Sequence, residues 1–276
     1  ASSSWSVSAD ARTYTFEIRS DARWSDDAPV TAADFQLAWL RVLHPRTEAP
    51  CAPLLFGIDN ARAFHEGRCG PMDVGIRTVG ARTLVVKLAQ PSAFFPYVLV
   101  HPATYPVPAH ALARSSPSSS SPSSGALPTN GPFLLERGEP KKRLVLKKNP
   151  TYRGIVTGNV GEIDCAMFSH YPDAFAAYAR GDIEVLDLIA AEHDVIREAR
   201  RRFPDELFFE PLHSTHYAAF RVDKPPLDDV RVRRALALAI DRNELAHVLA
   251  DAPHEVAKGG FIPPTLPAHS SSLSLP

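Results

Sequence analysis

Cysteine is scarce in this chain of 276 residues, and its three copies form no recognisable motif. Cys51, Cys69 and Cys165 include no CxxC pair and no Cys/His cluster with zinc-ligand spacing, which argues against a zinc finger or a dithiol redox site. Cys51 and Cys69 flank a short helical stretch, so they could form a disulfide in an exported protein. Free thiols are the equal alternative, because sequence contains no information about the distance between them.

Long apolar runs and an excess of charge are also missing. No stretch approaches the roughly 18 apolar residues that a membrane-spanning helix needs. Residues 1–5 have neither the basic start nor the apolar run of a signal peptide, so the chain is expected to be cytosolic, or a mature or cropped piece of an exported protein. The 30 basic residues nearly cancel the 31 acidic ones, which argues against a broad surface for nucleic acid or anionic membrane.

The common catalytic motifs are absent as well. There is no phosphate-binding glycine loop, no HExxH and no GxSxG. His110, His193 and His254 are isolated among polar residues, which is the usual setting of a solvated histidine. Asp26 and Asp27 are followed by no further oxygen ligands at regular spacing. We therefore expect no catalytic residue, no cofactor and no metal.

Proline and serine, in contrast, are concentrated in a few segments. Proline makes up 26 of the 276 residues, nearly twice the usual share of about 5%. It clusters at 102–108, 225–226 and 263–267, which predicts stiff connections across the surface. The Ser/Pro-rich tract 115–125 has no apolar residue with which to pack a core, so it predicts a mobile surface loop. This tract divides the sequence into two zones.

The first zone, up to about residue 112, has the pattern of a mixed α+β unit. Alternating β-forming residues predict a strand over 14–18. Trp24 lies among polar and acidic residues and looks exposed, whereas Thr31 with Asp34 predicts a helix N-terminus. The following apolar stripe predicts a helix that ends at Pro45. Further along we expect a short helix over 58–66, a hairpin of strands 74–79 and 83–88 turning at Gly80, and a buried apolar segment over 94–100.

The second zone, from Asn130 onward, alternates strands with helices. The expected strands are 133–137, 143–148, 162–168, 184–188, 207–210 and 215–222. The expected helices are 172–180, 190–202 and 229–250, and Asp241 can cap a second segment of the last one. This alternation indicates a mostly parallel sheet flanked by helices.

Seven short segments, each weak alone, occur in a recognisable order along nearly the whole chain. They are YTFEIR at 14–19, WSDDAPVTAADF at 24–35, TLVVKL at 83–88, NGPF at 130–133, LKKNPTY at 146–152, PPLDDVRVRRAL at 225–236 and GFIPP at 260–264. In this order and spacing they resemble the extracytoplasmic solute-binding proteins of peptide ABC transporters, the oligopeptide- and dipeptide-binding family. Asp27 and Arg153 depart from the family pattern, which usually has Gly and Trp at these positions.

The resemblance implies an α/β fold with a periplasmic-binding-protein type II-like lobe, a mixed sheet with flanking helices, and a smaller α+β extra domain. It implies the division 1–112 for the extra domain, 113–128 for the Ser/Pro-rich loop, 129–265 for part of the ligand-binding lobe and 266–276 for a tail leading to a second lobe. Family members begin earlier, with a signal peptide and a first strand, and continue further. We therefore expect an incomplete portion that lacks the second lobe.

The resemblance also implies a function without catalysis. Such a receptor captures short peptides outside the cytoplasm, in the periplasm or at the membrane, and delivers them to ABC permease subunits. It is a monomer when full-length and binds no nucleic acid. A ligand-sensing or interaction module that kept the fold without transport is the alternative. Because the closing lobe lies beyond residue 276 in the family, this chain alone should bind peptides with a Kd of about 1 mM or worse.

The candidate ligand-binding residues are Thr215, His216 and Tyr217, since the family places an aromatic-rich strand beside its cleft here. Successive residues of a strand face opposite sides, so one of His216 and Tyr217 should point at the ligand and the other into the packing. The alternative is that both are ordinary strand residues.

Overall fold

The computed structural model describes residues 2–112, 127–155, 157–210, 214–248, 260–263, 266, 269 and 270. The tract 115–125 and His254 lie outside these residues. The chain divides into two compact units, Ala1–Met167 and Phe168–Pro276, which are described separately below. None of the helices in the described ranges has the length and apolar content needed to cross a bilayer.

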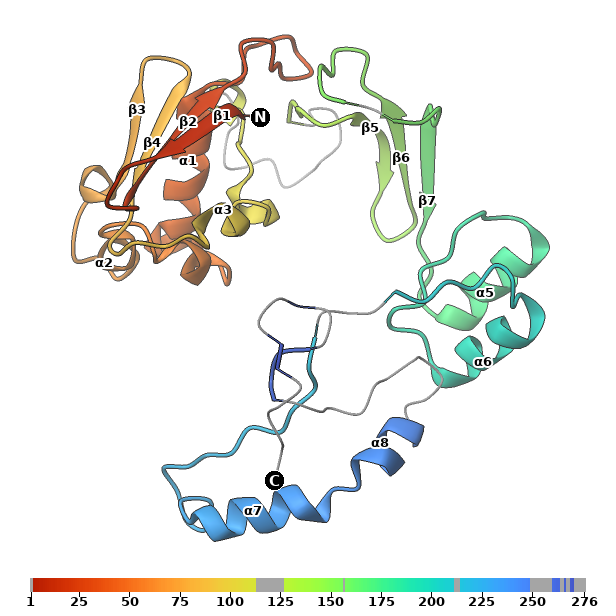
Figure 1. Cartoon of the computed structure of the whole chain (residues 1–276). Helices are drawn as coiled ribbons and strands as arrows, with labels where there is room; N and C mark the ends of the chain where they lie inside the picture. The colour runs from red at the N-terminus through yellow and green to blue at the C-terminus, as the bar shows by residue number, and fades with distance from the viewer. Residues whose placement is uncertain are drawn as a thin grey trace. The chain divides into compact units, whose positions relative to one another are not determined.

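A four-stranded antiparallel sheet forms the first layer of unit 1 (Figure 1). Its strands are β1 (Ser2–Val7), β2 (Thr13–Ile18), β3 (Ile76–Val79) and β4 (Thr83–Lys87), in the order β1-β2-β4-β3. The three predicted strands are confirmed, and Gly80 turns the β3–β4 hairpin with φ +63°. β1 was not predicted, because its sequence is mostly serine. Its backbone pairs with β2, and that pairing makes it a strand.

Helix α1 (Ala32–Leu43) forms where the sequence predicted a helix, and it packs against β3 and β4. A capping box begins it: the Asp34 carboxylate accepts the Thr31 backbone N–H at 2.8 Å and the Thr31 hydroxyl at 3.1 Å. The helix ends at Leu43, because His44 adopts an extended conformation before Pro45.

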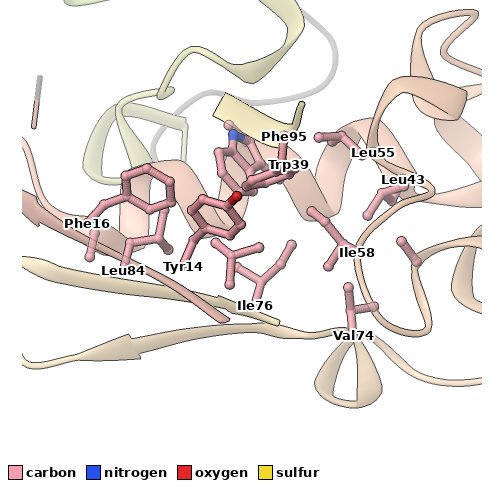
Figure 2. Packing of buried hydrophobic residues seen from close by; sticks show 14 of the residues in the cluster. Tyr14, Phe16, Trp39, Leu43, Leu55, Ile58, Val74, Ile76, Leu84 and Phe95 are labelled. Carbon is pink, nitrogen blue, oxygen red and sulfur yellow. The ribbon is translucent and has the colours of Figure 1, made fainter. Parts of the chain in front are cut away.

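The core of unit 1 lies between this sheet and α1 (Figure 2). Tyr14, Phe16 and Ile18 are the buried residues of β2, and they alternate with half-buried ones. The ring of Tyr14 lies 5.3 Å from that of Phe95, and Trp39 meets Phe95 edge-on at 6.3 Å. The apolar residues of β2, β3 and β4 therefore share a single core with those of α1 and with Phe95.

Two burial predictions in unit 1 were wrong. Trp24 is only 2% exposed, because it packs in the hydrophobic core, where its indole N–H donates to the buried Asp34 carboxylate at 3.2 Å. In the segment 94–100, Phe95 is buried, but Phe94, Tyr97 and Val100 are 67%, 70% and 71% exposed. This segment holds the single turn α3 (Phe95–Val98), and one turn can present only one side to the core.

Short helical turns connect these elements. They are η1 (Pro45–Thr47), η2 (Ala52–Leu55), α2 (Ala61–His65), η3 (Pro71–Asp73), η4 (Pro102–Thr104) and α4 (Ala109–Leu112). α2 lies inside the predicted range 58–66, and Gly67 follows it with φ +73°. Proline occupies the first or second position of each of the four 3-10 turns named here, which suits its fixed φ.

A second antiparallel sheet completes unit 1. It contains β5 (Phe133–Glu139), β6 (Arg143–Lys148) and β7 (Glu162–Ala166), in that order. The three strands expected over 133–168 are thus confirmed. Exposed cross-strand ion pairs join Arg143 to Asp164 and Lys147 to Glu136.

Unit 2 is helical in its described part. Its helices are α5 (Tyr171–Arg180), α6 (His193–Arg202), α7 (Val230–Ala239) and α8 (Arg242–Val248). Gly181 ends α5 with φ +79°, as its position predicted. The Asp241 carboxylate caps α8 by accepting the backbone N–H groups of Asn243 at 2.9 Å and Glu244 at 3.0 Å. The predicted helices are therefore confirmed within the described residues, including the second segment that Asp241 caps; residues 249–250 of the last predicted helix lie outside them.

The strands predicted over 184–188, 207–210 and 215–222 do not form. Every strand pair among the described residues is antiparallel, so the expected mostly parallel sheet is also wrong for this part of the chain. A strand needs a hydrogen-bonding neighbour as well as β-forming residues, and these segments have none within the described residues. Phe208 illustrates the result, since its side chain is 85% exposed.

Candidate functional site

The predicted ligand-binding segment 215–217 lies against a distant part of unit 2. The Thr215 hydroxyl donates to the Phe261 carbonyl oxygen at 2.8 Å. The rings of Tyr217 and Phe261 meet edge-to-face, with centroids 5.0 Å apart and planes at 70°. These contacts bring residues 215–217 together with Phe261 of GFIPP, one of the segments that carry the family resemblance. Sequence reasoning did not foresee this pairing, and the aromatic residue inside GFIPP was its one available signal.

The side chains of this site remain accessible. Tyr217 is 69% exposed and Phe261 is 63% exposed, whereas Thr215 is half-buried. His216 is exposed as well. The expectation that His216 and Tyr217 lie on opposite faces of a strand is wrong in its premise, because residues 215–222 form no strand in the structure. The site therefore offers an aromatic pair, whose rings can contact an apolar group and whose phenol can hydrogen-bond.

Two residues considered separately in the sequence form a pair in unit 1. His110 donates through Nε2 to the Asp26 carboxylate at 2.7 Å, so the prediction of an isolated His110 was wrong. This hydrogen bond is the main cause that lowers the pKa of Asp26 below its ordinary value of 3.8. Across the described ranges, no three His, Cys, Asp or Glu side chains gather closely enough to hold a metal ion.

The three cysteines are free thiols, each half-buried. Cys51 and Cys69 therefore form no disulfide in the structure, which agrees with the free-thiol alternative. The Cys69 thiol lies 3.7 Å from the Asn60 carbonyl oxygen, a weak polar contact.

Comparison with known proteins confirms the family that the order of short segments resembled. The family model for bacterial extracellular solute-binding proteins, family 5 Middle, matches residues 1–275. The periplasmic oligopeptide-binding protein OppA of Escherichia coli (strain K12) is 32% identical over 260 residues, which cover 92% of this chain and 47% of that protein. The probable deoxycholate-binding periplasmic protein YgiS of the same organism is 32% identical over 244 residues, covering 88% of this chain and 45% of the other.

Solved structures show the same relationship. The Escherichia coli murein tripeptide binding protein MppA superposes with a TM-score of 0.78 at 29% identity, over 96% of this chain and 51% of that one. Burkholderia pseudomallei OppA gives a TM-score of 0.78 at 29% identity, over 95% and 51%. The chain thus spans about half the length of these relatives, and its mixed α/β structure corresponds to an incomplete lobe. This chain belongs to family 5 of the bacterial extracellular solute-binding proteins.

Proposed function

We propose that this chain is part of a substrate-binding component of an ABC transporter that captures short peptides. The observation that carries the proposal is the family match across residues 1–275. Relatives at 30–32% identity are named for oligopeptides, murein peptides and dipeptides. Because the match covers about half of each relative, the ligand of the whole protein is inferred from those names.

The same reasoning supports the location and the partners. Relatives from Escherichia coli are named as periplasmic, and a similar solved structure is named as the substrate-binding domain of an oligopeptide ABC transporter from Bacillus anthracis. We infer action outside the cytoplasm and delivery to membrane permease subunits. We assign the protein no catalytic step and no nucleic-acid partner, and we infer a monomer for the full-length receptor.

Within this proposal, residues 1–112 form the extra α+β domain and residues 129–265 contribute to the ligand-binding lobe. The tract 113–128 connects them, and 266–276 leads onward to a second lobe. Thr215, His216 and Tyr217 form one wall of the peptide site. Exposure of Tyr217 beside Phe261 supports this assignment, since an accessible aromatic pair can hold side chains of varied peptides without selecting one sequence.

A bile-acid ligand is the second candidate. It is favoured by one observation, the 32% identity to a relative named as probable deoxycholate-binding. An interaction module that kept the fold without binding a solute would bind neither ligand class. Titrations with short peptides and with deoxycholate therefore separate the three possibilities.

The test of the site uses Tyr217→Ala in ligand-observed NMR with a mixed tripeptide library. We expect wild-type binding with a Kd of about 1 mM or worse and a loss of at least about threefold in affinity for the variant. The matched control is Tyr97→Ala in unit 1, because Tyr97 is 70% exposed and Tyr217 is 69% exposed. The control should bind like wild type, and neither variant should change the melting temperature.

Two results would contradict the proposal. An equal loss of peptide affinity in Tyr217→Ala and Tyr97→Ala would show that residues 215–217 do not form a wall of the peptide site. A folded chain that binds no peptide even at high concentration would favour the interaction module, unless deoxycholate binds in its place.

A further inference from the structure

A cavity of about 640 Å³ lies within unit 1, and none of the residues 215–217 lines it. Two chain segments form its walls: the loop and helix around α2, and residues 89–92, which follow β4. The Ala89 backbone N–H donates to the Gly57 carbonyl at 3.0 Å, and Ile58 forms a bridge with Leu88. Backbone contacts thus hold the two walls together. The volume suits an organic molecule of moderate size.

The lining of this cavity is positively charged. Arg62 and Arg68 belong to it, and no acidic side chain does. Arg68 Nε donates to Glu66 Oε2 at 3.0 Å, and this pairing is the main cause that lowers the pKa of Glu66. Arg62, by contrast, forms no ion pair with any of the described residues. One glutamate against two arginines leaves an excess of positive charge.

The setting of Arg62 suits recognition of a planar anion. Its guanidinium lies 5.1 Å from the centroid of the Phe56 ring. A guanidinium stacked on an aromatic face is held in position while its N–H groups point outward along its edge. That edge matches the two oxygens of a carboxylate. Ala63 and Pro91 add apolar surface, and Gln90 adds an amide.

We propose that this cavity binds an organic carboxylate, with the carboxylate on Arg62 and the apolar body against Ala63 and Pro91. A single negative charge matches the excess positive charge of the lining. The same chemistry has two sources: a free organic acid, or the carboxyl terminus of a peptide. The site is independent of the proposed function, because it involves no residue of the 215–217 wall.

The experiment is a ¹⁵N amide chemical-shift titration of the whole chain with phenylacetate, and with its uncharged analogue phenylacetamide. We expect phenylacetate to shift amides of residues 56–68 and 89–92 with a Kd of about 1–10 mM, as befits about ten non-hydrogen atoms. Phenylacetamide should produce no saturable shift. N-acetylglycylphenylalanine and its amide form the second arm: tighter binding by the peptide acid identifies a peptide terminus, and tighter binding by phenylacetate identifies a free acid.

Two variants locate the site. Arg62→Gln should weaken phenylacetate binding at least about tenfold, and Arg62→Lys should give an intermediate value because it keeps the charge without the planar fork. Arg82→Gln is the control, since Arg82 is exposed in the β3–β4 turn at the opposite end of β4. Unchanged binding in Arg62→Gln, equal binding of phenylacetamide, or shifts confined to other residues would each overturn the proposal. Because the Arg62 side chain is exposed, Arg62→Gln and Arg62→Lys should both have the melting temperature of the wild type.

Discussion

The Asp34 carboxylate is the most consequential polar group in the core of unit 1. It is 3% exposed and joins three parts of the chain. One oxygen accepts the Trp24 indole N–H at 3.2 Å and the Thr31 backbone N–H at 2.8 Å. The other accepts the Ala109 backbone N–H at 3.0 Å. Asp34→Ala would therefore leave these three donors, and the Thr31 hydroxyl that donates at 3.1 Å, without their acceptor.

The size of the effect follows from these contacts. A buried donor that loses its partner costs about 1–3 kcal/mol, and loss of a helix cap costs about 0.5–2 kcal/mol. Thr31 and Ala109 are only partly buried, so water can compensate some of this loss. We expect Asp34→Ala to lower the free energy of unfolding of unit 1 by about 3–5 kcal/mol. That is a large fraction of the about 5–15 kcal/mol typical of a domain.

Urea unfolding followed by tryptophan fluorescence measures this change, because Trp24 and Trp39 are each 2% exposed in the folded state. Asp21→Ala is the matched control, since Asp21 forms an exposed ion pair with Arg19 and should contribute less than about 1 kcal/mol. Asp34→Asn should also destabilise unit 1, because its amide would place a donor against other donors. Equal unfolding free energies for the Asp34→Ala and Asp21→Ala variants would refute the reasoning.

Two further predictions concern unit 1. The folded-state pKa of Asp26 lies below its unfolded value because His110 donates to it, so this contribution to stability is present above about pH 4 and is lost as pH falls through the folded pKa. Asp26→Asn should accordingly flatten the fall in melting temperature on acidification, and an unchanged acid profile would contradict this. Gly75→Ala should destabilise unit 1 by about 1–3 kcal/mol, since a Cβ there would lie 2.5 Å from the Lys87 carbonyl oxygen. The control Gly57→Ala has open space and should be nearly neutral in the same thermal melts; equal effects would rule out the steric explanation.

Elements whose causes lie within a few neighbouring residues were predictable. α1 begins at the Thr31–Asp34 capping box and α8 begins at Asp241, because in each case a nearby carboxylate accepts a backbone N–H at the start of the helix. α5 ends at Gly181, because glycine readily adopts the left-handed conformation found there. The β3–β4 hairpin belongs with them, since its strands lie close in sequence around Gly80. Family membership was also readable, because it depends on the order of short segments along the chain.

Features that depend on residues distant in sequence could not be predicted from the sequence alone. β1 exists because β2 pairs with it, while 207–210 and 215–222 have β-forming residues and no partner within the described residues.

The candidate sites also depend on residues that are distant in sequence. Residues 215–217 were selected by resemblance, but the contact of Tyr217 with Phe261 joins positions 44 residues apart. His110 meets Asp26 across 84 residues of sequence. The charged cavity likewise needs α2 and the segment after β4 to lie together. Local hydrogen bonding and periodicity act over a few residues, whereas these contacts arise from the packing of segments whose distance in sequence says nothing about their distance in space.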